Sequence, residues 1–190
     1  GGIGLFRSEF LYMESGSKPP TEEYQFQVYK LAAESMGSNR VVIRLADLGG
    51  DKIAQCVDMG KQSNPAIGIR GMRLLFDKEE ILLEQMRAIL RASGYGNVCI
   101  LLPMVVSLEE VEKAKGMLEK AKRSLKQAKA AFNENIPVGV MIETPAAVMI
   151  SGELAREVDF FSIGTNDLSQ LTLGMDRTNR KIEKYYNPYH

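Results

Sequence analysis

Two carboxylates, Glu143 and Asp167, stand just beyond short apolar runs that are typical of buried strands. Carboxylate oxygens are ligands that Mg²⁺ prefers, and a magnesium site commonly uses one or two of them with water and substrate oxygens. We therefore expect Glu143 and Asp167 to bind Mg²⁺, or Mn²⁺ in its place, next to an anionic ligand. A plainer interpretation is that both carboxylates only stabilise the N-termini of the helices that follow them.

Basic residues occur at similar places along the chain. Arg7 and Arg44 follow apolar runs, Arg70 stands in the segment NPAIGIRGMR, Arg177 in GMDR, and Lys52 follows paired glycines in LGGDK. Arginine recognises carboxylate and phosphate groups through two parallel hydrogen bonds. A single charge after a strand usually just faces water. Because two arginines and two carboxylates mark four separate strand ends, we favour a binding site for an anion.

Short apolar runs predict the strands that carry these residues. The predicted strands are residues 3–6, 41–43, 98–104, 138–142 and 160–163. Amphipathic segments lie between them, so strand and helix alternate. This alternation predicts an α/β fold with a parallel sheet covered by helices, either a doubly wound sheet or a (β/α)8 barrel. In both folds ligands bind at the carboxyl ends of the strands, where the charged residues lie.

Capping signals predict where the helices begin and end. The expected N-caps are Thr21, Asp77, Ser107, Thr144 and Asn166. The helix after Thr21 is expected to end before Gly37, and the helices after Asp77 and Ser107 to cover about residues 78–92 and 108–130. The helix after Thr144 is expected to begin at Pro145, and the helix after Asn166 to end before Gly174. Residues 46–76 are the one long irregular stretch. Its length is typical of a functional loop.

Composition excludes several classes of function. The 190 residues carry 24 basic and 24 acidic side chains, so no overall positive field attracts nucleic acid or an anionic membrane. Cys56 and Cys99 lie far apart and His190 is the only histidine, so neither a zinc site nor a Ser/His/Asp triad is predicted. No apolar run approaches the roughly 20 residues of a membrane span. We expect a cytoplasmic protein that neither inserts into membranes nor binds nucleic acid.

Several longer motifs resemble one protein family. The segments GIGLFRSEFLYM, IRLADLGGDK, NPAIGIRGMR, VGVMIETPAA and VDFFSIGTNDLSQLTLGMDRTN are similar to the carboxyl-terminal, phosphoenolpyruvate-binding barrel of Enzyme I of the bacterial sugar phosphotransferase system. The resemblance runs nearly end to end. IETPAA and FFSIGTNDL also occur in pyruvate phosphate dikinase and phosphoenolpyruvate synthase. RSEFLYM, GTNDLSQ and DRTN favour Enzyme I among these relatives.

The resemblance implies a phosphotransferase that uses phosphoenolpyruvate (PEP) and has a partial (β/α)8 barrel of about five parallel strands. It implies that Glu143 and Asp167 ligate Mg²⁺. The residues implied to bind PEP are Arg7, Arg44, Lys52, Arg70, Asn166 and Arg177. In the family the phosphoryl group passes to a histidine on a separate amino-terminal domain and then to the phosphocarrier protein HPr, leaving pyruvate. The family barrel is also where two subunits form a homodimer.

The chain also departs from the family pattern. The family barrel has eight strands, so we expect residues 1–190 to form a single, incomplete barrel domain with two open sheet edges. The family's acid cysteine and phosphoacceptor histidine have no counterpart, so we expect no catalytic residue here and no turnover by this chain alone. Alternatives are a dikinase or synthase fragment, a magnesium-dependent enzyme of the citrate lyase type, and a dimerisation scaffold. The spread of arginines favours a phosphorylated ligand.

Overall fold

A computed structural model of the chain describes residues 1–49, 56–60 and 62–187. Its strands form one five-stranded sheet in which every neighbouring pair is parallel. The strands are β1 (Ile3–Arg7), β2 (Val41–Arg44), β3 (Val98–Leu102), β4 (Val138–Ile142) and β5 (Phe160–Ile163). All five predicted strands are found, and β2, β3 and β4 are buried as expected. The expectation of full burial is wrong for β1 and β5, which are partly exposed because they are the edge strands of the described sheet. β3 is shorter than predicted because Pro103 follows it and Met104 has a φ of 51°, outside the strand region.

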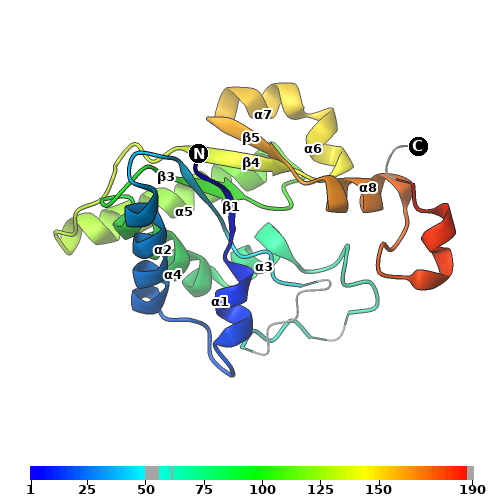
Figure 1. Cartoon of the computed structure of the whole chain (residues 1–190), viewed down its shortest axis with the longest axis horizontal. Helices are drawn as coiled ribbons and strands as arrows, with labels where there is room; N and C mark the ends of the chain where they lie inside the picture. The colour runs from blue at the N-terminus through cyan, green and yellow to red at the C-terminus, as the bar shows by residue number, and fades with distance from the viewer. Residues whose placement is uncertain (50–55, 61, 188–190) are drawn as a thin grey trace.

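The order of the strands in the sheet is their order in the chain, from β1 to β5. Each crossover therefore steps in the same direction, as in a barrel, whereas a doubly wound sheet reverses direction partway. With helices between the strands, the structure confirms an α/β fold that winds as a partial barrel does (Figure 1). β1 and β5 form the edges of this sheet within the described residues.

Helices connect the strands and continue beyond the last one. They are α1 (Glu9–Glu14), α2 (Glu22–Met36), α3 (Gly71–Asp77), α4 (Glu79–Ala92), α5 (Leu108–Gln127), α6 (Pro145–Met149), α7 (Ser151–Glu157), α8 (Thr165–Leu173) and the 3₁₀ helix η1 (Arg180–Tyr185). Three predicted caps are confirmed, because the side chains of Thr21, Ser107 and Thr144 each accept a backbone N–H from the first turn. Gly174 ends α8 in a left-handed conformation, as expected.

Two predicted caps are wrong. Asp77 ends α3, and α4 begins after Lys78, whose side chain makes no capping hydrogen bond. Asn166 lies inside α8, whose N-cap is Gly164. The short helices α1 and α3 are not predicted from the sequence, and α3 begins inside the stretch 46–76. Helices of one or two turns have little stability of their own and form where tertiary packing supports them.

The sheet has two different faces. Val41 and Ile43 of β2 belong to the main apolar core, over which α2 and α4 pack side by side (Figure 1). The opposite face carries a smaller apolar cluster of Val42, Cys99, Leu101 and Met141. Because side chains alternate along a strand, Arg44 lies on the same face as Val42. In the part of the chain that the structure describes, no helix combines the length and apolar character that crossing a membrane requires.

Candidate functional site

The charged residues at the strand ends surround one cavity. Its volume is about 350 Å³, within the range of roughly 300–1,000 Å³ that is usual for small-molecule sites. Six residues selected from the sequence line it, namely Arg7, Arg44, Glu143, Asn166, Asp167 and Arg177. Arg70 lines a neighbouring cavity of about 240 Å³, which Asp167 and Arg177 also border. Lys52 lies outside the described residues.

The register of the sheet explains why these residues meet. Arg7 and Arg44 are paired residues of β1 and β2. Glu143 directly follows β4, whose last residue is paired with Ile163 of β5. A Cβ atom on Gly164, the next residue, would lie 2.6 Å from the Cβ of Glu143. The close approach of the two strand ends therefore requires glycine at this position.

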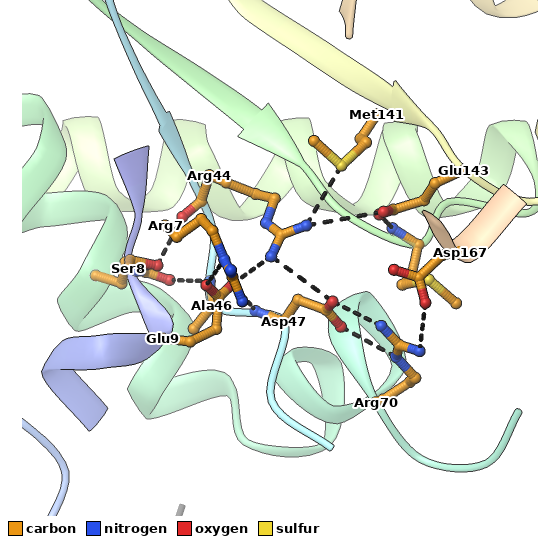
Figure 2. A network of polar contacts seen from close by, with 12 residues as sticks. Arg7, Ser8, Glu9, Arg44, Ala46, Asp47, Arg70, Met141, Glu143 and Asp167 are labelled. Atoms are coloured by element: carbon orange, nitrogen blue, oxygen red, sulfur yellow. Dashed lines mark hydrogen bonds and ion pairs between the residues drawn. The ribbon is translucent and has the colours of Figure 1, made fainter. Parts of the chain in front are cut away.

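Arg44 is buried in the middle of a polar network (Figure 2). Its Nη2 atom lies 2.9 Å from Oε1 of Glu9 and 3.8 Å from Oδ2 of Asp47. Its Nη1 atom lies 3.7 Å from Oε2 of Glu143 and donates to Sδ of Met141 at 3.3 Å. Burial by itself would lower the pKa of Arg44, but the charges of these three carboxylates raise it above its ordinary value. The guanidinium group therefore stays positive.

Arg70 bridges two carboxylates at the same place. It donates from Nε and Nη2 to both oxygens of Asp47, at 3.2 and 2.7 Å, and from Nη1 to Oδ1 of Asp167 at 2.9 Å. Burial alone would lower the pKa of Arg70, but the charges and hydrogen bonds of both partners raise it. Arg70 thus holds the orientation of Asp167 beside the cavity. Since Asp167 also lies in the first turn of α8, it can stabilise that helix as well.

Two further acidic residues, Glu9 and Asp47, complete the network, and sequence reasoning misses both. Their exposed fractions are 1% and 0%. Besides Arg44, Oε1 of Glu9 accepts the backbone N–H of Asp47 at 2.9 Å. Their spacing was the available signal, because Glu9 follows the strand-end residue Arg7 by two positions and Asp47 follows Arg44 by three. An acid that close to a buried arginine is a natural counter-ion.

The buried part of the network carries a surplus of negative charge. Among the described residues, four buried carboxylates (Glu9, Asp47, Glu143 and Asp167) face two buried guanidinium groups (Arg44 and Arg70). Burial raises the pKa of Glu143 to about 7, and the charges of Asp47 and Asp167 add to this effect. A divalent cation would balance the surplus, and the hard oxygens of Glu143 and Asp167 suit Mg²⁺.

The protein supplies only part of a metal coordination shell at this place. Within the described ranges, no three His, Cys, Asp or Glu side chains gather closely enough to enclose an ion. Mg²⁺ is usually bound through one or two carboxylates, with water and substrate oxygens as the other ligands. The donor set formed by Glu143 and Asp167 therefore fits an ion that binds together with an anionic substrate.

Backbone strain is found directly beside Glu143. Met104 has a φ of 51°, a left-handed conformation that costs a residue other than glycine about 1–2 kcal/mol. In this conformation its N–H donates to Oε1 of Glu143 at 2.7 Å. A Cβ atom on Gly71 would lie 2.7 Å from the Cβ of Met104, so a glycine makes room for it. The strained residue keeps Glu143 in one orientation.

Two buried polar atoms in this network lack a hydrogen-bond partner. They are Oε2 of Glu9 and Nε of Arg44, and no other buried side-chain atom of the described residues shares this property. Nε of Arg7 lies 3.7 Å from Oε2 of Glu9, which is an ion-pair distance but too long for a hydrogen bond. Because buried polar atoms are normally paired, the unsatisfied donor and acceptor indicate a place where water or a ligand binds.

Comparison with known proteins gives one family. The model of that family is described as "PEP-utilising enzyme, PEP-binding domain", and it matches residues 1–190. A phosphoenolpyruvate-protein phosphotransferase of Haemophilus influenzae is 48% identical over 189 residues, which are 100% of this chain and 33% of that protein. The proteins of the same name from Buchnera aphidicola (subsp. Schizaphis graminum) and Geobacillus stearothermophilus are 50% and 45% identical, over 98% and 99% of the chain.

The chain spans about a third of the length of these curated relatives, since it covers 32–33% of each. Among solved structures, a citrate lyase from Burkholderia xenovorans is 25% identical and superposes with a TM-score of 0.40, covering 50% of this chain and 29% of that one.

Proposed function

Because this chain belongs to the family of PEP-utilising enzymes and matches its PEP-binding domain over residues 1–190, we propose that the cavity at the strand ends binds PEP together with Mg²⁺. The observation that carries the proposal is the convergence of three arginines and two carboxylates on one cavity. The residues are Arg7, Arg44, Arg177, Glu143 and Asp167. PEP has a phosphate and a carboxylate, the two groups that arginine recognises best.

The arginines divide into two groups with different tasks. Arg44 and Arg70 are buried and held by carboxylates, so they supply positive charge in a fixed position. The side chain of Arg7 is 45% exposed, and Arg177 is half-buried on the same cavity, so both reach a ligand that enters from solvent. Charge that is ordered in advance stabilises the negative charge that develops on a transferred phosphoryl group and on the enolate left behind. Asn166 and Lys52 are proposed to assist as hydrogen-bond donors.

We assign Glu143 and Asp167 as the ligands of Mg²⁺. Each carboxylate is already oriented, Glu143 by the backbone N–H of Met104 and Asp167 by Arg70. When bound, the ion would neutralise charge on the phosphate and enolate oxygens of the substrate. Arg44, 3.7 Å from Glu143, keeps that carboxylate next to a buried positive charge at the cavity.

Since the chain covers about a third of relatives named phosphoenolpyruvate-protein phosphotransferase, we propose the complete reaction only for a protein of their length that contains this domain. There the phosphoryl group of PEP would pass to a histidine outside this domain, and the enolate left behind would take up a proton to become pyruvate. The phosphohistidine would then pass the phosphoryl group to HPr. By itself the chain is proposed to bind PEP without turning it over. We further propose a cytoplasmic location. We also propose that the chain forms a homodimer, which sedimentation analysis would test.

Titration calorimetry of PEP into the chain, with and without Mg²⁺, tests the proposed ligand. We expect binding that depends on Mg²⁺ and weakens at least about tenfold in Glu143→Gln and Arg44→Lys, since a charge-assisted hydrogen bond contributes about 1.5–3 kcal/mol. The matched control is Arg123→Ala, because Arg123 is an exposed residue of α5 that does not line the cavity. It should bind PEP as the parent chain does. A folded parent chain that does not bind PEP would refute the proposal.

A further inference from the structure

A chain of buried hydrogen bonds runs from α4 to the ends of β1 and β2. Its central residue is Gln85 of α4, which is fully buried. Oε1 of Gln85 accepts the backbone N–H of Ala46 at 2.9 Å, and Nε2 donates to Oγ of Ser8, also at 2.9 Å. Ser8 donates in turn to the backbone carbonyl of Arg44 at 2.6 Å. One side chain of the helix layer therefore holds both segments that carry the strand-end charges.

The chemistry of each group decides which partner donates and which accepts in these hydrogen bonds. The N–H of Ala46 can only donate, so the amide oxygen of Gln85 faces it and the amide nitrogen faces the other way. The carbonyl of Arg44 can only accept, so the hydroxyl of Ser8 donates to it and accepts from Gln85. The amide nitrogen also donates to the hydroxyl of Tyr29 at 3.1 Å. Every hydrogen is used once, which permits a single arrangement of the amide.

The contacts of Gln85 lie on both sides of the point where β2 ends. The carbonyl of Arg44 is held through Ser8, and the N–H of Ala46 is held directly. The next residue, Asp47, then binds Glu9 through its N–H and Arg70 through its carboxylate. The direction in which the chain leaves β2 thus decides where these charges lie. Gln85 does not line the cavity itself.

We propose that Gln85 is a positioning residue, which acts through Ser8 and the N–H of Ala46 to place the strand-end arginines for the anion. The inference rests on the proposed binding of PEP. Residues that orient the ligands of a metal typically change metal affinity or activity 10–100-fold when altered, and a displacement on the order of 1 Å in a catalytic site can cost about 100-fold. We therefore expect a roughly tenfold weaker affinity for PEP when this connection is lost.

Calorimetric titration of PEP in the presence of Mg²⁺ compares three variants with a matched control. Gln85→Met keeps the shape of the side chain without its hydrogen bonds, and Ser8→Ala removes the link to Arg44. Each should weaken PEP binding about tenfold, and the double variant should be no weaker than the worse single one because both act through one connection. The control Tyr29→Phe removes the third hydrogen bond of Gln85, together with the one that the Tyr29 hydroxyl donates to Oε1 of Gln25 at 3.1 Å. It should lower the unfolding temperature but leave PEP affinity within about twofold.

Amide hydrogen exchange gives a second measurement that needs no ligand. In Gln85→Met the amide of Ala46 should exchange at least about tenfold faster, while Tyr29→Phe should leave it protected. An unchanged Ala46 exchange rate in Gln85→Met, unchanged PEP affinity, or an equal loss of affinity in Tyr29→Phe would each overturn the positioning role. Absence of PEP binding by the parent chain would instead overturn the proposed function, and the exchange experiment would still decide the role of Gln85.

Discussion

Replacing Asp47 with asparagine removes the negative charge that lies between the two buried arginines. Asp47 accepts hydrogen bonds from Arg70 at 2.7 and 3.2 Å and lies 3.8 Å from Arg44. Asparagine keeps the size and one acceptor oxygen, but its amide nitrogen would face a guanidinium donor. A charge-assisted hydrogen bond contributes about 1.5–3 kcal/mol, and removing one partner of a buried pair costs about 3–5 kcal/mol. We expect a direct loss of about 3 kcal/mol in the free energy of unfolding.

An opposing effect arises at Glu143. After burial, the charge of Asp47 is the next cause that raises the pKa of Glu143 to about 7. One pKa unit corresponds to about 1.4 kcal/mol. Because the charge of Asp47 causes only part of the pKa shift of Glu143, removing it should add about 1 kcal/mol to the free energy of unfolding. This relief exists only where Glu143 is ionised, above about pH 7. The net loss should therefore be about 3 kcal/mol near pH 5.5 and about 2 kcal/mol near pH 8.

Urea unfolding at these two pH values, without Mg²⁺, measures the two effects. Thermal unfolding gives a second measurement, because for a chain of this length a loss of about 2 kcal/mol lowers the unfolding temperature by about 4–8 °C. Glu119→Gln is the control, since Glu119 is an exposed residue of α5 that pairs with Lys122 on the same helix. This substitution should change stability by less than about 0.5 kcal/mol. Asp47→Asn that is as stable as the parent, or that loses more near pH 8 than near pH 5.5, would refute this account of the network.

Three further changes test other parts of the structure. Thr144→Ala removes a hydroxyl that donates to the carbonyl of Val105 at 2.7 Å and caps α6. Urea unfolding should show that the free energy of unfolding falls by about 1–2 kcal/mol, and a fall below about 0.5 kcal/mol would contradict the capping role. Gly164→Ala places a Cβ atom 2.6 Å from that of Glu143, so calorimetry should detect no Mg²⁺-dependent PEP binding even where circular dichroism shows a folded chain. Burial raises the pKa of Tyr29 above its ordinary value of 10.0. The unfolded chain ionises first, so stability that is present below about pH 10 should fall as the pH rises further, and Tyr29→Phe should reduce this fall.

The strands and the positions of the charged residues could be predicted because short apolar runs leave a strong local signal, although β1 and β5 are partly exposed rather than buried. Runs such as Val138–Ile142 are apolar on both faces, and Glu143 breaks the run at its end. The choice between a doubly wound sheet and a barrel needed the strand order, which is a property of tertiary structure. The short helices α1 and α3 could not be predicted, since helices of one or two turns depend on what they pack against.

The sequence alone places Arg7, Arg44, Glu143 and Asp167 at the carboxyl ends of parallel strands, which lie along one edge of the sheet. That these residues line one cavity depends on the strand order and the winding of the sheet, which are properties of the tertiary structure. How these charges are held depends on the folded structure. Glu9 and Gln85 come from helices that are far from Arg44 in the chain, and their roles depend on hydrogen-bond distances that no local pattern encodes. Because these groups are buried, no water can replace a lost partner, so their hydrogen bonds fix the orientation of the charged side chains.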